Sequence, residues 1–356
     1  MEQEIKQLLK EGTVIPAHPL ALNSSRMLDE ERQRLLTRYY IASGAGGVAV
    51  GVHTTQFEIR KPSVNLYAEV LKLAAEEIAR AGLKKPFIKV AGICGNGRQA
   101  MAEAQTALQY GYHLGLVNLA GLDNYSEEEL IKHVQAISTI IPVFGFYLQP
   151  AIGGRIFSYN FWRQFTEIPN VYAIKIAAFN RYFTLDVVRA VCSCSRADEI
   201  ALYTGNDDNI VADLLTPYRF TVNGAIVEKR FVGGLLGHWA VWTSKAVELL
   251  NEIKNVYAGS LSSLEGLFTK GVAITDMNAA IFDPHHSFNG CIPGIHEVLR
   301  RQGLLPGRWC LDEHEDLSAG QLEEIERIYA SYHYLTDDAF VHNFLTGKTA
   351  NKKETA

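Results

Sequence analysis

The chain has 356 residues, of which 47% are hydrophobic and 21% charged, and its formal net charge is −5 at pH 7. This composition is typical of a globular protein with a sizeable core, and the scattered basic residues do not form the patch that nucleic-acid or anionic-membrane binding needs. The charged start MEQEIKQLLKEG has no apolar signal region, and no run reaches the roughly 18 apolar residues of a membrane span. We therefore expect a cytoplasmic protein with small-molecule partners, no nucleic acid and no membrane.

Eight short apolar segments, separated by amphipathic helical ones, predict a parallel sheet wrapped by helices. In chain order they are 13–17, 46–52, 86–92, 114–119, 142–147, 171–177, 199–205 and 231–236, with helices expected over segments such as 28–43, 67–82, 97–111 and 126–138. Eight strand–helix units favour a TIM (β/α)8 barrel, and an open doubly wound sheet is the alternative.

Local signals support these helix boundaries. Ser126 and Glu129 have the spacing of a capping box, and Gly44, Gly82 and Gly111 stand where a helix C-cap favours a left-handed residue. The Asn-Gly in FTVNGAIV (220–227) predicts a hairpin inserted before the last strand.

After about residue 250 helices dominate, ending with the segment 318–335. We predict a barrel over 12–250, a C-terminal helical region packed on it over 251–340, and a disordered polar tail over 341–356.

A lysine lies in the middle of the apolar sixth strand, NVYAIKIAAFNRY (170–182). Strand alternation puts Lys175 on one face with Ala173 and Ala177, which leave space beside the amine. Its stem could extend along the barrel to solvent or to an acid. Alternatively, an apolar site lowers the pKa of the amine and makes it a nucleophile toward a ketone. Lys89, in PFIKVAG, is a rival that the pattern does not exclude.

The fifth strand, PVFGFYLQP, offers a possible partner. Alternation puts Val143, Gly145 and Tyr147 on one face, and we expect Tyr147 to point inward at the C-terminal rim, where barrel active sites assemble. A core tyrosine with a satisfied hydroxyl is the alternative. An inward tyrosine beside the amine would serve imine chemistry as a proton shuttle.

Three motifs, FYLQP, AIKIAAFN and YTGNDDNI, resemble in order and spacing the strand-five, strand-six and strand-seven motifs of the dihydrodipicolinate synthase / N-acetylneuraminate lyase family of class I aldolases. The resemblance extends from about residue 12 to about residue 335. It implies a TIM barrel that forms a Schiff base with pyruvate or a related 2-keto acid, without a metal or organic cofactor, in a homodimer or homotetramer. By this resemblance Lys175 is the Schiff-base lysine and Tyr147 relays protons.

The resemblance also implies substrate-binding residues. GVHTTQFE resembles the family's GTTGE loop, so Thr54 and Thr55 are expected to hold the keto-acid carboxylate, with His53 taking part. Gly205, in the YTGNDDNI turn, is expected to line the same site.

Other segments depart from the family pattern. NLAGLDNY stands where the best-known members have a TPYY-type stretch, so the relay tyrosine is missing or moved to Tyr125. The arginine that meets the second substrate's carboxylate would be Arg155, displaced in PAIGGR.

The expected function is thus a lyase or aldolase that makes or breaks a C–C bond with a 2-keto acid, and an aldehyde is the candidate second substrate. A dehydratase or hydratase-aldolase acting on a sugar acid or aromatic pyruvate adduct is one alternative. A non-catalytic keto-acid-binding regulator is another.

Metal and dinucleotide sites are not expected. Asp283, His285 and His286 in DPHHS lack the spacing of metal ligands, and Asp207 and Asp208 suit a turn or a helix cap. The five cysteines match no zinc framework, and the glycine-rich segments GNGRQA and GGLLGHW do not match a G-x-G-x-x-G motif.

Overall fold

The computed structural model describes residues 1–259 and 263–347. Its central sheet has eight parallel strands, and each coincides with a predicted strand segment. They are β1 (Val14–Pro16), β2 (Gly47–Val50), β3 (Ile88–Ile93), β4 (Leu114–Val117), β5 (Val143–Leu148), β6 (Val171–Ala177), β7 (Ala201–Thr204) and β10 (Phe231–Leu236).

The eight strands curl into a barrel. Their order is β1-β10-β7-β6-β5-β4-β3-β2, which leaves β1 and β2 at the two edges. A parallel bridge between Ala17 and Ala49 joins these edges, and the His18 N–H donates to the Ala49 carbonyl at 2.8 Å. The predicted TIM barrel is confirmed, and the open-sheet alternative is wrong.

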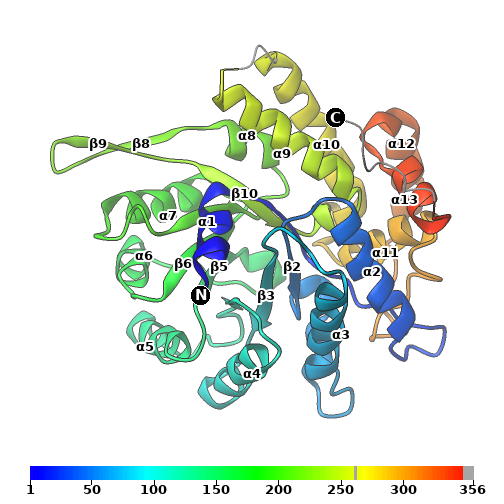
Figure 1. Ribbon diagram of the computed structural model, residues 1–356, viewed down its shortest axis with the longest axis horizontal. Helices are drawn as coiled ribbons and strands as arrows, with labels where there is room; N and C mark the ends of the chain where they lie inside the picture. The colour runs from blue at the N-terminus through cyan, green and yellow to red at the C-terminus, as the bar shows by residue number, and fades with distance from the viewer. Residues whose placement is uncertain (260–262, 348–356) are drawn as a thin grey trace.

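Helices surround the strands (Figure 1). They are α2 (Glu30–Ala42), α3 (Tyr67–Arg80), α4 (Gly97–Gln109), α5 (Glu127–Ser138), α6 (Tyr159–Thr166), α7 (Arg181–Ser193) and α8 (Ile210–Leu215). The capping box of Ser126 and Glu129 is present at the start of α5. Gly44, Gly82 and Gly111 have positive φ, as expected for residues that end helices.

An antiparallel hairpin, β8 (Tyr218–Val222) and β9 (Ala225–Lys229), interrupts the alternation before β10. Asn223 and Gly224 at its turn both have positive φ, which a type I′ turn requires. The predicted insertion is confirmed, and the hairpin extends away from the barrel (Figure 1).

Helix α1 (Gln3–Glu11) covers the N-terminal end of the barrel. Ile5 and Leu9 pack among the residues of the barrel interior, and the Tyr203 hydroxyl donates to the Leu9 carbonyl at 3.0 Å. This end is therefore closed, and access to the interior must come from the opposite end.

The C-terminal helices are α9 (Thr243–Tyr257), α10 (Leu264–Phe282), α11 (Cys291–Arg301), α12 (Gln321–Ser331) and α13 (Asp338–Leu345). Helix α9 contacts β1 and α8, and the later helices pack against the barrel helices, for example where the Tyr39 hydroxyl of α2 donates to Asp337, the residue before α13, at 2.8 Å. In the described ranges no helix combines the length and the apolar character that crossing a membrane requires.

Two of the predicted boundaries differ from the structure. Helix α9 continues across the predicted border at residue 250. The tail predicted from residue 341 is wrong over 341–345, because these residues belong to α13 and Val341 is buried. The rest of that prediction, from residue 348 onward, lies outside the described residues.

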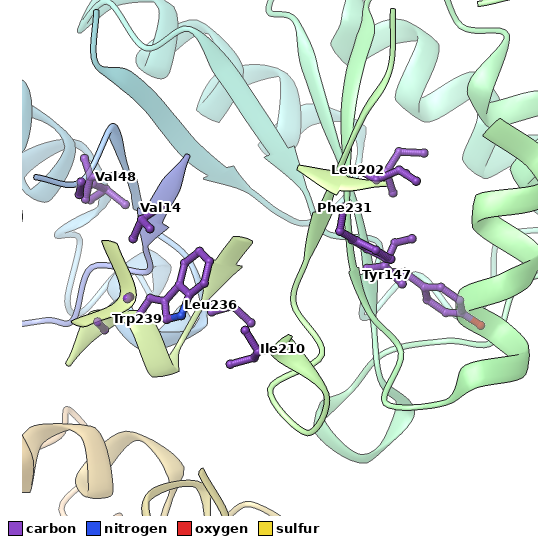
Figure 2. Packing of buried hydrophobic residues seen from close by; sticks show 14 of the residues in the cluster. Val14, Val48, Tyr147, Leu202, Ile210, Phe231, Leu236 and Trp239 are labelled. Atoms are coloured by element: carbon purple, nitrogen blue, oxygen red, sulfur yellow. The ribbon is translucent and has the colours of Figure 1, made fainter. Parts of the chain in front are cut away.

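The strands separate two apolar layers, one inside the barrel and one between the strands and the helices. The layer to which a strand residue belongs shows which way its side chain points. Ile15, Val90, Leu116, Phe144 and Leu235 belong to the layer inside the barrel. The larger layer lies between strands and helices, and Figure 2 shows part of it.

Candidate active site

Lys175 projects into the barrel from β6, on the face it shares with Ala173 and Ala177. It lines a cavity of about 60 Å³ at the C-terminal end of the strands. The amine lies 4.4 Å from the centre of the Phe146 ring on the neighbouring strand. In TIM-barrel enzymes this end of the strands holds the active site, so Lys175 lies where a catalytic lysine is expected.

Lys175 and Asp207 are the charged residues that line this cavity. Burial lowers the pKa of the Lys175 amine, and the nearby Asp207 carboxylate opposes that effect. Burial likewise raises the pKa of the Asp207 carboxyl, opposed by the lysine charge. No direct ion pair joins the two side chains in the described part of the chain. Burial brings the pKa of Lys175 down to about 8 and that of Asp207 up to about 7, so both groups can exchange protons near neutral pH.

Asp207 is held in place by the elements around it. It follows β7, and its Oδ1 accepts a hydrogen bond from the His238 N–H at 3.2 Å. The Asn278 side chain of α10 donates to the Asp207 carbonyl at 2.5 Å. The sequence predicted a turn or capping role for Asp207 and did not predict that its side chain lines the cavity. The available signal was an acid at the carboxyl end of a barrel strand.

A buried network fixes the loop that carries Asp207. Asp213 of α8 accepts hydrogen bonds from Thr204 at 2.7 Å and from Asn206 at 2.9 Å, and it pairs with Arg181. Asn206 in turn accepts from the Phe179 N–H at 3.0 Å. The loops after β6 and β7 are thus tied together on both sides of the lysine.

Gly205 gives the lysine its space. A Cβ at this position would lie 2.5 Å from Lys175 Cε and 2.9 Å from the Ala177 Cβ. Gly205 lines the cavity, as expected. The two short distances show that a side chain does not fit at this position.

The two threonines of the GVHTTQFE loop have different surroundings. Thr55 Oγ1 donates to the His18 carbonyl at 2.7 Å and accepts from the Gly51 and Val52 N–H groups. Its hydroxyl is therefore occupied in holding the loop. Thr54 lines the cavity, and its buried hydroxyl has no hydrogen-bond partner among the described residues. Thr54 is the one that can bind a ligand.

His53 also lines the cavity, from the short 3-10 helix η1 (His53–Thr55). Burial, aided by the positive charge of Lys175, lowers the pKa of its imidazole to about 4. The ring is therefore neutral at pH 7 and can donate or accept a hydrogen bond.

The model of the Dihydrodipicolinate synthetase family matches residues 10–226, which is more than half of the chain. The chain belongs to this family. No curated protein matches it.

Solved structures of family members resemble the whole fold. N-acetylneuraminate lyase from Fusobacterium nucleatum complexed with pyruvate is 16% identical with a TM-score of 0.70, and the match covers 92% of this chain and 99% of the lyase. Dihydrodipicolinate synthase from Oceanobacillus iheyensis is 15% identical with a TM-score of 0.71, covering 93% and 99%. A dihydrodipicolinate synthase from Cyanidioschyzon merolae with lysine bound is 17% identical with a TM-score of 0.70, covering 90% and 97%. At these identities the likeness shows the fold alone.

The expectation that Tyr147 points inward is wrong in this family member. Strand β5 pairs with β6 so that Phe146 lies beside Lys175, and Tyr147 lies beside Ile176 on the outer face. The centre of the Tyr147 ring lies 5.1 Å from that of the Trp162 ring. Figure 2 shows Tyr147 in the helix-facing layer. Both faces of β5 are apolar and buried, so the sequence holds no polarity signal that tells them apart.

Arg155 lies outside the cavity lining. Its guanidinium donates to the Tyr125 carbonyl at 2.6 Å and lies 5.9 Å from the Phe157 ring centre. Tyr125 does not line the cavity either. Neither Arg155 nor Tyr125 therefore takes the position in the cavity that the family resemblance implied. Lys89 is also excluded, because Ile88 and Val90 beside it face the barrel interior.

The C-terminal region covers the cavity, which the sequence did not predict. Phe282 at the end of α10, Phe288 in the following loop and Cys291 at the start of α11 all line it. Burial raises the pKa of the Cys291 thiol far above its ordinary value, so the thiol stays protonated.

The DPHHS segment has a local structural role. Asp283 accepts hydrogen bonds from His286 at 2.6 Å and from the Ser318 hydroxyl at 2.5 Å. Within residues 1–259 and 263–347, no group of three or more histidine, cysteine, aspartate or glutamate side chains is arranged to hold a metal ion.

Proposed function

We propose that the protein is a class I lyase or aldolase in which Lys175 forms a Schiff base with pyruvate or another small 2-keto acid. The observation that carries this proposal is a buried lysine amine, without a direct ion pair among the described residues, that opens onto a cavity at the catalytic end of the barrel. An uncharged amine can attack a ketone carbon, and the resulting iminium withdraws electrons from the neighbouring C–C bond. Membership in the Dihydrodipicolinate synthetase family supports the same class of reaction.

The cavity favours a small substrate. At about 60 Å³ it lies well below the roughly 300–1,000 Å³ of pockets that hold drug-sized ligands. The Thr54 hydroxyl is a donor for the keto-acid carboxylate, and His53 and Gln149 are polar groups nearby. Aromatic and aliphatic side chains make up most of the remaining wall.

A sugar acid or an aromatic pyruvate adduct needs more room than this. The dehydratase and hydratase-aldolase alternatives therefore require the cavity, whose wall includes Phe282 and Phe288, to become larger. The acceptor aldehyde and a homodimeric or homotetrameric assembly remain predictions from the family resemblance.

One observation favours the second candidate, a keto-acid-binding regulator without turnover. The tyrosine expected to relay protons lies on the outer face of β5, in the helix-facing layer. A binding protein needs the cavity but no proton relay.

Reductive trapping separates the two candidates. The protein is incubated with pyruvate and sodium borohydride, and the modified peptide is identified by mass spectrometry. We expect an adduct on Lys175, its complete loss in Lys175→Ala, and its retention in the matched control Lys89→Ala. Pyruvate binding by calorimetry without any adduct would favour the regulator, and an adduct on Lys89 would contradict the assignment of the lysine.

A further inference from the structure

We propose that Asp207 supplies and removes the protons of the Schiff-base reaction at Lys175. This inference rests on the proposed function and assigns the proton-transfer group that Tyr147 does not provide. Its basis is the position of a buried carboxyl on the same cavity as the amine.

The hydrogen bonds of Asp207 leave one carboxyl oxygen available. Oδ1 accepts from the His238 N–H, and no described residue donates a hydrogen bond to Oδ2. The backbone is fixed by Asn278, so the carboxyl is positioned without its second oxygen being used. That oxygen can reach a substrate bound at the amine through the shared cavity.

The proton count of imine formation matches this pair. An uncharged amine and a ketone become a cationic iminium and water only when one proton is added. The Asp207 carboxylic acid donates that proton to the carbonyl oxygen. The oxygen leaves as water, which carries this proton and one of the two amine protons. The nitrogen keeps its other proton. The product is an iminium cation facing an Asp207 carboxylate.

The same carboxylate then serves the carbon chemistry. It removes a proton from the carbon next to the iminium, which gives a neutral enamine and restores the carboxylic acid. No other reagent is needed in either step. The two protein groups together carry no net charge at either stage, because the iminium cation forms only as Asp207 becomes a carboxylate.

The other groups that face Asp207 or Lys175 are poor proton carriers near neutral pH. Burial lowers the pKa of His53 and of His238 to about 4, so both are neutral. Burial keeps the Cys291 thiol protonated. Asn278 does not titrate, and the Asp208 side chain next in sequence is exposed.

A purely electrostatic role for Asp207 predicts the opposite result from a proton-transfer role. The negative charge of Asp207 raises the pKa of Lys175, so its removal increases the fraction of uncharged amine. If charge were the whole effect, Asp207→Asn would form the imine faster near pH 7. A proton carrier predicts a slower reaction.

The experiment measures exchange of the pyruvate methyl protons for deuterium by NMR, together with borohydride trapping. In Asp207→Asn, whose amide oxygen can still accept from His238, we expect exchange to slow by about 100-fold or more, since general acid–base catalysis contributes roughly 10²–10⁴-fold. The adduct should still form on Lys175. The control Asp208→Asn should exchange within about 2-fold of the wild type.

Chemical rescue tests the same idea in a second variant. Formate should restore exchange in Asp207→Ala at least about 10-fold and leave Asp207→Asn unchanged, an effect that a merely structural role would not produce. Wild-type exchange in Asp207→Asn, with the Lys175 adduct intact, overturns this inference alone. Absence of any adduct in the wild-type protein overturns the proposed function and this inference with it.

Discussion

Replacing Gly205 with alanine tests whether the room around the Lys175 stem is essential. The added Cβ would lie 2.5 Å from Lys175 Cε, whereas carbon atoms in contact are about 3.5 Å apart. The lysine must therefore move by about 1 Å. The added Cβ cannot relieve this contact by shifting toward Ala177, because it would meet the Ala177 Cβ at 2.9 Å. Gly205 does not have positive φ, so the backbone itself tolerates alanine.

Two effects of Gly205→Ala follow from these distances. Overpacking of this kind costs about 1–3 kcal/mol of the free energy of unfolding. A reacting group displaced by about 1 Å loses roughly 100-fold in rate. We therefore expect thermal unfolding a few degrees lower and borohydride trapping with pyruvate about 100-fold slower.

Gly97→Ala is the matched control. This glycine begins α4, has no positive φ, and a Cβ there would meet nothing within 4 Å. It should leave the trapping rate unchanged and should not lower the unfolding midpoint, because alanine at a compatible helical position stabilises by about 0.4–1 kcal/mol. Trapping at the wild-type rate in Gly205→Ala would refute the steric reasoning.

Three further predictions concern hydroxyl groups near the barrel. Thr54→Val removes an unpartnered hydroxyl. It should weaken keto-acid binding, measured by calorimetry, by about 10- to 150-fold, since a hydrogen bond to a charged group contributes roughly 1.5–3 kcal/mol. Unchanged affinity would remove Thr54 from the site. Thr55→Val should instead lower the thermal unfolding midpoint, because that hydroxyl makes three backbone hydrogen bonds. Tyr147→Phe should trap pyruvate within about 2-fold of the wild-type rate, and loss of the adduct would show that the phenol reaches the reaction after all.

The strands and the inserted hairpin were predictable because their signals are local. A buried parallel strand is a short apolar run between turn signals, and the Asn223-Gly224 turn specifies its own backbone conformation. The capping box before α5 is equally local. Such features depend on residues a few positions apart, so tertiary contacts rarely override them.

The orientation of β5 was not predictable in this way. Phe146 and Tyr147 are both large and aromatic, and either could fill the barrel interior. The register with β6 shifts between Val143 and Phe144, and after this irregularity Phe146 lies opposite Lys175. A one-residue difference in register reverses the face of every side chain that follows.

The sequence by itself determined the eight strand segments, the inserted hairpin and the two candidate lysines, because periodicity and turn chemistry specify such features locally; closure of the barrel and the choice of Lys175 over Lys89 came from the structure. Only the tertiary structure decided what surrounds the amine. It brought Asp207 from the β7 loop and Phe282 and Cys291 from the C-terminal helices onto one cavity, and it turned Tyr147 toward the helices. Contacts between segments so far apart depend on packing of the whole chain, which no local pattern encodes.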